Sequence, residues 1–116
     1  MSGVVVVLTG NDLARHVTPW RGVLTHIAGL RSAAQHPLAI DRVCWQGEPV
    51  AVAVADSRAV AEDAVERIGI EWEPLAAVVD PTTALDPGTP VIHDELGDNL
   101  AFGSRIMAAG RDPPAT

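Results

Sequence analysis

The sequence is poor in cysteine and in aromatic residues. Among 116 residues there are one cysteine, no tyrosine and one phenylalanine, so three tryptophans make up most of the aromatic content. The single Cys44 excludes an internal disulfide and any zinc or iron–sulfur site built from several cysteines of this chain. We expect Cys44 to pack as a small hydrophobic residue in a reducing environment. The core must be aliphatic, and an apolar content of 47% is enough to build one.

Lysine and long apolar runs are also missing. All eight basic residues are arginines, and 15 acidic residues leave a formal net charge of −7. An acidic chain without a basic stripe binds phosphate backbones poorly, so we expect no nucleic-acid partner. No apolar run approaches the roughly 18–20 residues of a membrane span, and Met1-Ser2-Gly3 lacks the basic start of a signal peptide. We therefore expect no membrane partner and a cytoplasmic location.

The N-terminal third begins with a continuous run of β-branched residues. Val4-Val5-Val6-Val7-Leu8 predicts a strand buried on both faces, which Thr9-Gly10 closes by turning the chain. A short helix is expected over 11–15 with Asn11 as its N-cap. Residues 16–37 show neither helical nor strand periodicity and predict a long loop, and ordered loops of this length usually serve a function or pack on a partner.

The middle of the chain predicts a pair of strands. The residues over 40–49 lead into the turn Gln46-Gly47-Glu48-Pro49, and the apolar run over 50–55 follows it. The second strand has no polar face, so we expect it to be central, with valines on one side and small alanines facing a helix on the other.

An amphipathic helix is predicted over 58–68, with Asp56 or Ser57 as its N-cap. Opposite charges four residues apart pair Arg58 with Glu62 and Asp63 with Arg67 on its outer face. Gly69 has the position of a left-handed helix stop. Alternation over 70–73 predicts one more strand. The expected fold class is therefore α/β (α+β), with a mixed sheet and one main amphipathic helix.

Several polar groups are candidates for chemistry, and each has a simpler explanation. Adjacent residues point in different directions, so His93-Asp94-Glu95 is read as an exposed acidic turn rather than a metal site. The spacing of His16, His26 and His36 gives no reason to expect that they lie close together in the fold. Glu71 and Glu73 could do acid–base chemistry as a pair, but a solvated strand face explains them. We predict no catalytic, cofactor-binding or metal-binding residue. The turn formed by Trp45, Gln46, Gly47, Glu48 and Pro49 is the candidate contact with another domain.

A family resemblance rests on an ordered set of motifs. The stretch over 46–58 is similar to a "V-G-E-P-V-A-x-V-V-A" strand, and Ala61-Glu62-Asp63-Ala64 repeats the "A-E-D-A" helix that follows it. Residues 70–81 resemble "V-x-Y-E-P-L-P-A-V-V-D-P". Weaker matches are found over 3–13 and 91–102. In this order the motifs resemble the α/β hammerhead domain in the large subunit of molybdenum hydroxylases, the family of xanthine dehydrogenase, aldehyde oxidase and aerobic carbon monoxide dehydrogenase.

The resemblance implies a non-catalytic part of an oxidoreductase that hydroxylates aldehydes or N-heterocycles, or oxidises carbon monoxide. It implies molybdopterin with molybdenum in another domain, and 2Fe–2S clusters and commonly FAD on companion domains or subunits. The partners would be the molybdenum-binding domain and the iron–sulfur and FAD subunits. Residues 1–102 would form a hammerhead domain truncated at both ends, and 103–116 a frayed or unrelated tail.

Two other functions remain open on the sequence. One is a free-standing scaffold or partner-binding module that reuses the fold. The other is a small metal-assisted hydrolase using His93 and its neighbouring carboxylates. In the hammerhead interpretation, strands that precede the segment over 3–10 would be missing, so we expect an open sheet edge and self-association.

Overall fold

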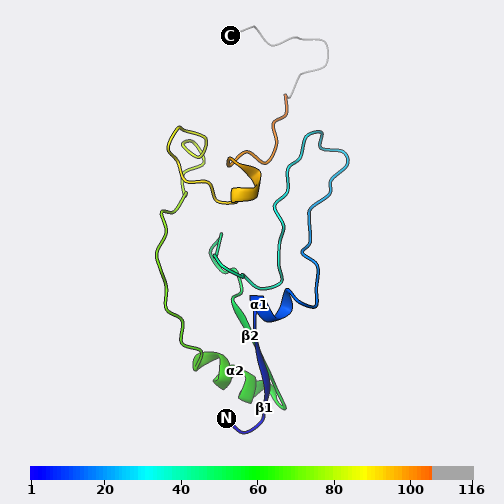
Figure 1. Cartoon of the computed structure of the whole chain (residues 1–116), viewed down its shortest axis with the longest axis vertical. Helices are drawn as coiled ribbons and strands as arrows, with labels where there is room; N and C mark the ends of the chain where they lie inside the picture. The colour runs from blue at the N-terminus through cyan, green and yellow to red at the C-terminus, as the bar shows by residue number, and fades with distance from the viewer. Residues whose placement is uncertain (106–116) are drawn as a thin grey trace.

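The computed structural model describes residues 1–105. The elements run in the order β1 (Val4–Thr9), α1 (Gly10–Leu13), β2 (Ala51–Ala55), α2 (Arg58–Glu66) and the 3₁₀ turn η1 (Asp94–Leu96). The two strands and α2 lie together near the N-terminus, and long segments without regular structure extend away from them (Figure 1). Of the tail predicted over 103–116, residues 106–116 lie outside the described part of the chain.

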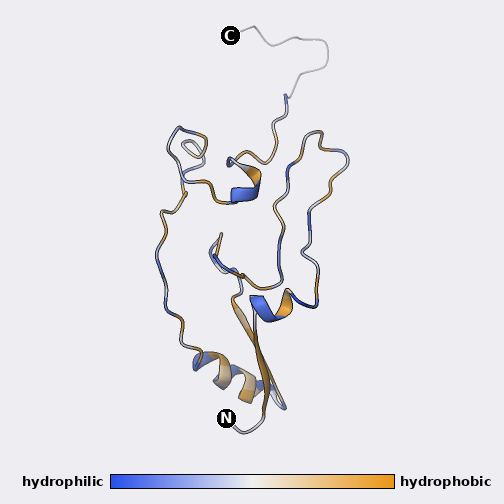
Figure 2. Cartoon of the chain, in the orientation of Figure 1, coloured by the Kyte–Doolittle hydropathy of each residue, from blue (hydrophilic) through white to orange (hydrophobic). Residues whose placement is uncertain are grey.

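The sheet of the described residues is antiparallel and two-stranded, with β1 paired to β2. Val7 lies opposite Ala53 and Leu8 opposite Val52, and an irregularity near Val5 interrupts the register. β-Branched side chains favour extended backbone, which accounts for β1, and both strands are hydrophobic along their length (Figure 2). The predicted strand pair is wrong, because residues 40–49 form no strand and β2 pairs with a segment much earlier in the chain.

The expected burial of both strands is also wrong. Val5 and Val7 are 66% and 45% exposed, and Val52 and Val54 are 37% and 44% exposed. Val7 and Val52 occupy neighbouring positions of the paired register and therefore point to opposite faces of the sheet. Both faces thus keep apolar side chains in contact with solvent, although α2 packs against β2. A central strand needs a neighbour on each side, and β2 has one among the described residues.

α1 begins one residue earlier than expected, and Thr9 rather than Asn11 is its N-cap. The Thr9 amide and hydroxyl both donate to the Asp12 carboxylate, at 2.9 and 2.7 Å. These two hydrogen bonds favour the ionised carboxylate and lower the pKa of Asp12, with the backbone donor the larger cause. The strand therefore passes directly into the helix.

α2 confirms the main predicted helix, and Ser57 is its N-cap. The Ser57 hydroxyl accepts a hydrogen bond from the Val60 amide at 3.3 Å. The predicted Arg58–Glu62 pair is present at 2.7 Å, whereas Asp63 and Arg67 form no ion pair.

The end of α2 differs from the prediction. The helix ends at Glu66, and the amides of Arg67 and Ile68 donate to carbonyls three residues earlier. Gly69 does not have a positive φ, so the left-handed stop is wrong. The last turn tightens into 3₁₀ hydrogen bonds and satisfies its own carbonyls without a glycine.

Residues 70–73 also form no strand, and Ile70 and Trp72 are 44% and 62% exposed. Their alternating pattern fits a half-buried strand, but no neighbouring strand of the described chain receives it. The buried hydrophobic residues of the described part are Ala33, Leu38 and Ala64. The α/β class with one main amphipathic helix is confirmed, and none of the helices in residues 1–105 is long and apolar enough to cross a membrane.

Candidate interaction site

The turn over 45–49 is confirmed as a structural feature. The Glu48 amide donates to the Trp45 carbonyl at 3.2 Å, and Gly47 has φ +90°, a value that favours glycine. The Glu48 carboxylate accepts from the Cys44 amide at 2.5 Å, and the Pro49 carbonyl accepts from the Ala39 amide at 2.8 Å. The polar groups of the turn are therefore used to hold its shape.

The aromatic side chain of this turn stays in solvent. Trp45 is 55% exposed, and its indole lies beside Gly47, where an added Cβ would be 3.7 Å from the ring. An exposed tryptophan on a hydrogen-bonded turn is typical of a contact point, because a large apolar surface is presented at little cost in entropy.

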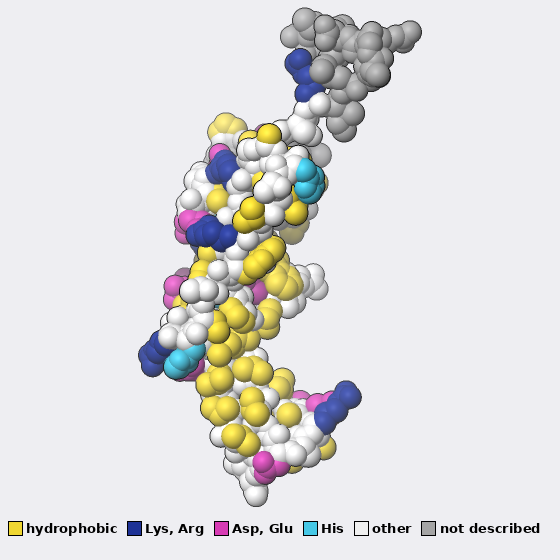
Figure 3. All heavy atoms as spheres, turned by 90° about the vertical axis from the view of Figure 1, so that its right-hand side faces the viewer, with side chains coloured by type: hydrophobic (Ala, Val, Ile, Leu, Met, Phe, Trp, Pro, Cys, Tyr) yellow, Lys and Arg dark blue, Asp and Glu magenta, His cyan; other side chains and the backbone are white. Residues whose placement is uncertain are grey.

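A groove of about 1220 Å³ runs beside the turn. Its lining joins the segment over 39–46, the extended segment over 68–79 and residues 90–92, and it includes both Trp45 and Trp72. Trp72 is 62% exposed, so two indoles face an open hollow rather than a packed core. Figure 3 shows hydrophobic side chains gathered over the lower part of the molecule, where β1, β2 and α2 lie.

Cys44 lies in the lining of this groove and is half-buried. Burial raises the pKa of its thiol, and the Glu48 carboxylate adds to the effect. The sulfur lies 3.6 Å from the Ile92 carbonyl oxygen. A protonated thiol in this position packs as a small hydrophobic group, and a nucleophilic role would require the opposite pKa shift.

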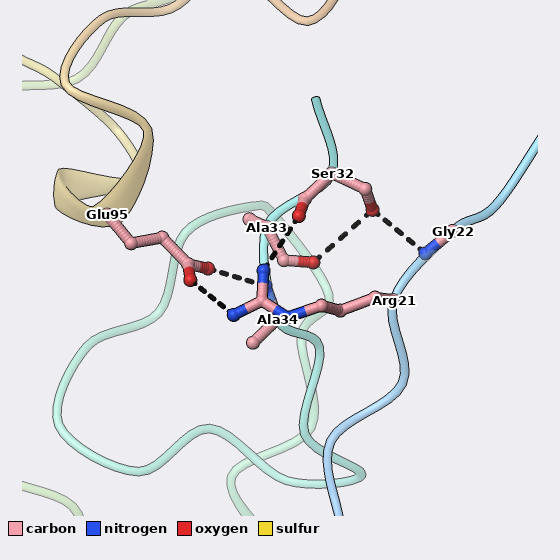
Figure 4. Close-up of polar contacts among 6 residues, drawn as sticks. All are labelled: Arg21, Gly22, Ser32, Ala33, Ala34 and Glu95. Atoms are coloured by element: carbon pink, nitrogen blue, oxygen red, sulfur yellow. Dashed lines mark hydrogen bonds and ion pairs between the residues drawn. The ribbon is translucent and has the colours of Figure 1, made fainter. Parts of the chain in front are cut away.

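The His93-Asp94-Glu95 segment forms the start of η1, and its carboxylates are bound to arginines. Asp94 pairs with Arg42 at 2.6 Å, and Glu95 pairs with Arg21 at 2.6 Å (Figure 4). The hydrogen bond from Arg21 is the main cause that lowers the pKa of Glu95, followed by that from the Ala34 amide. The lowered pKa keeps Glu95 ionised at neutral pH. The two ion pairs hold separate parts of the chain together.

The other polar candidates are not brought together. No group of three or more His, Cys, Asp and Glu side chains in residues 1–105 is placed to hold a metal ion. His16 and His26 are exposed, His36 is partly buried with its Nδ1 atom unpaired, and both Glu71 and Glu73 are exposed. Glu71 and Glu73 are thus solvated as expected, although residues 70–73 form no strand on which they would share a face.

Sequence reasoning missed the arginines Arg21, Arg31 and Arg42. Arg31 pairs with Asp98 at 2.8 Å, so all three bind the short segment over 94–98. The available signals were an acidic cluster after His93, and Arg21 and Arg31 within the irregular loop over 16–37. Arg42 lies just beyond this loop. The sequence separation of more than fifty residues hid the pairing.

The described residues therefore form a small α/β unit with an open apolar groove and a loop that is held by ion pairs. Residues 1–76 match the model of the aldehyde oxidase and xanthine dehydrogenase a/b hammerhead domain. The chain belongs to this hammerhead domain family of molybdenum hydroxylase oxidoreductases. The resemblance drawn from the sequence motifs is therefore confirmed.

Known relatives agree along nearly the whole chain. The nicotine 6-hydroxylase large subunit of Paenarthrobacter nicotinovorans is 37% identical over 105 residues, 90% of this chain and 13% of that protein. The carbon monoxide dehydrogenase large chain of Hydrogenophaga pseudoflava is 40% identical over 96 residues, 83% of this chain and 11% of that protein. Quinoline 2-oxidoreductase from Pseudomonas putida 86 has a similar fold, with TM-score 0.78 and 36% identity over 87% of this chain and 13% of its own. The chain thus spans a small fraction of the length of these relatives.

Proposed function

We propose that this chain is a non-catalytic hammerhead module that packs against the molybdenum-binding domain of a hydroxylase large subunit. The reaction of the intact enzyme would be hydroxylation of an aldehyde or N-heterocycle, or oxidation of carbon monoxide. The support is that relatives whose names state nicotine hydroxylation and carbon monoxide dehydrogenation match this chain over 11–13% of their length.

The observation that best supports the proposal is the apolar surface that the described residues leave exposed. The side chains of Trp20, Trp45 and Trp72 are 63%, 55% and 62% exposed. Valines of both strands are also exposed to solvent. Permanent interfaces are more hydrophobic than the rest of a protein surface, so a permanent partner would cover these side chains.

We place the principal contact at the turn formed by Trp45, Gln46, Gly47, Glu48 and Pro49 and at the neighbouring groove. The turn is held by hydrogen bonds, so the backbone that carries the exposed indole already has its shape before a partner binds. The domain would extend to about residue 102, beyond the matched segment over 1–76, because the Arg31 amide donates to the Ala101 carbonyl at 2.8 Å.

The molybdopterin, 2Fe–2S and FAD groups would be held by companion domains or subunits. A single cysteine cannot ligate a 2Fe–2S cluster, which takes four cysteine or histidine ligands. No cluster of metal-binding side chains is found within residues 1–105. One cysteine does not fit an iron–sulfur cluster, and the proposed part of this chain is to pack against the domains that hold these groups and to position them. The single cysteine is also the reason for placing it in the cytoplasm.

The test is complementation. The large subunit of quinoline 2-oxidoreductase would be produced without the segment that this chain matches, and the 116-residue chain supplied separately. The two should co-purify and recover molybdenum content, while the chain alone should not oxidise aldehydes, N-heterocycles or carbon monoxide. A chain that stays separate from the shortened subunit would contradict the proposal.

The same experiment separates the alternatives. Saturable binding to the intact large subunit, which keeps its own hammerhead, would favour a free-standing partner-binding module. Turnover of generic esters together with bound metal would favour the hydrolase. The arginine partners of Asp94 and Glu95 weigh against that last function, because they leave neither carboxylate free to work with His93.

A further inference from the structure

The loop over 20–35, which we call the arm, is an ordered limb that leaves the sheet region. Trp20 and Gln35 exchange two backbone hydrogen bonds of 2.8 Å at its base. The Gly22 amide donates to the Ser32 hydroxyl at 2.9 Å, and Arg21 donates to the Ser32 carbonyl at 2.9 Å (Figure 4). The two sides of the arm are thus joined at two levels, by Trp20 with Gln35 and by Arg21 and Gly22 with Ser32. Figure 1 shows the arm extending along the long axis.

The arm is also fastened to the segment over 94–101. Arg21 and the Ala34 amide both donate to the Glu95 carboxylate, so this carboxylate bridges the two sides of the arm. The Arg31 guanidinium binds Asp98 at 2.8 Å and also donates to the Leu96 carbonyl. These hydrogen bonds and ion pairs reduce the conformational freedom of the unbound arm. Less conformational entropy is therefore lost when a partner binds.

The tip of the arm has a different character from its base. Its sequence over 23–30, Val-Leu-Thr-His-Ile-Ala-Gly-Leu, contains no Asp, Glu or Arg. Val23 is 76% exposed and Leu24 is 48% exposed. The Ile27 amide donates to the Leu24 carbonyl at 2.9 Å, and Gly29 has φ +75°, so a turn closes the tip. The base is therefore held by charged groups, whereas the tip presents Val23 and Leu24 to solvent beside the polar side chains of Thr25 and His26.

We infer that the arm is a preformed docking element, whose tip at Val23 and Leu24 inserts into an apolar recess on the remainder of the hydroxylase large subunit. The inference rests on the proposed function and adds a contact separate from the turn over 45–49. An uncharged tip requires an apolar receiving surface, because exposed apolar ends on soluble proteins mark contacts with protein or membrane. The occupant is protein rather than lipid, because the tip carries no Arg or Lys to engage anionic headgroups. The relatives are much longer than the segment that this chain matches, and we infer that the receiving surface lies in that additional part of the subunit.

The experiment uses the full chain in the complementation described above and measures the dissociation constant. Val23→Asp combined with Leu24→Asp should weaken binding at least tenfold, because two carboxylates would enter an apolar recess. The matched control is Val65→Asp combined with Leu85→Asp, one valine and one leucine that are 53% and 59% exposed outside the arm. It should change binding less than threefold. Circular dichroism of each chain checks that α2 is retained.

A third variant tests the base. Glu95→Gln removes the charge that joins Arg21 and Ala34 and should weaken binding to a smaller extent than the tip variant, with faster proteolysis within 23–30. Equal binding by wild type and tip variant would overturn the arm inference while leaving the proposed function intact. Failure of the wild-type chain to bind would overturn both. Tighter binding of the wild-type chain to lipid vesicles than to the subunit would replace the protein recess by a membrane.

Discussion

Gly10 lies where the backbone of another segment approaches most closely. A Cβ atom added to it would lie 2.1 Å from the Ala39 carbonyl oxygen and 3.0 Å from the Ile40 Cα. Its φ is not positive, so the requirement comes from space and not from backbone conformation. The glycine expected to turn the chain after β1 therefore has a packing role, and the corner between β1 and α1 depends on it.

Gly10→Ala should lower the free energy of unfolding by roughly 1–3 kcal/mol, the usual cost of forcing atoms into occupied space. Gly69→Ala is the control, because no heavy atom lies within 4 Å of its added Cβ. That control should stay within about 0.5 kcal/mol of wild type. Urea denaturation followed by tryptophan fluorescence measures both, and equal midpoints for the two variants would show that Ala39 does not restrict this site.

At the scale of elements, α2 is the part of the chain most strongly determined by local interactions. Ser57 closes its first turn, and the Arg58–Glu62 pair lies on its surface. Ala64 is 7% exposed and is the buried residue of the helix. The helix therefore has a defined start, whereas its sheet-facing side is small and contributes little apolar area.

Ser57→Ala should cost about 1 kcal/mol, the typical value for removing an N-cap hydroxyl. Asp56→Ala is the comparison, since Asp56 was the other candidate cap and its side chain makes no hydrogen bond in the described residues. Thermal denaturation monitored at 222 nm gives the two midpoints. A larger loss for Asp56→Ala than for Ser57→Ala would reverse the assignment of the cap.

At the scale of the whole molecule, the apolar surface is too large for the core that the described residues build. The sheet has two strands, so β1 and β2 each have one unpaired edge among the described residues. β1 has no charge, proline or glycine to discourage pairing with another chain. Burying these groups requires a partner, whether the rest of a large subunit or a second copy.

The isolated chain should therefore self-associate through β1. Size-exclusion chromatography with light scattering should give a mass of at least two copies at micromolar concentration. Val7→Lys should shift the mass toward a monomer, because a charged lysine on an edge strand disfavours pairing. Val23→Asp should leave the mass unchanged, since it lies outside the sheet. A compact wild-type monomer of high thermal stability would contradict this expectation.

The sequence alone was sufficient for features whose contacts are short-range. Hydrogen bonding by Ser57, the i,i+4 pair of Arg58 and Glu62, and the turn that Gly47 allows all involve residues within four positions of one another. The extended preference of β1 is equally local. The ordered motifs also predicted the hammerhead family, which the family match confirms.

The tertiary structure decided everything that depends on distant segments. It paired β2 with β1 instead of residues 40–49, left residues 70–73 without a neighbour, and brought three arginines to the segment over 94–98. Periodicity describes which face of a segment is apolar, but it does not identify the segment that will cover that face. Strand partners and ion pairs far apart in sequence are selected by packing free energy summed over the folded chain, which no local pattern contains.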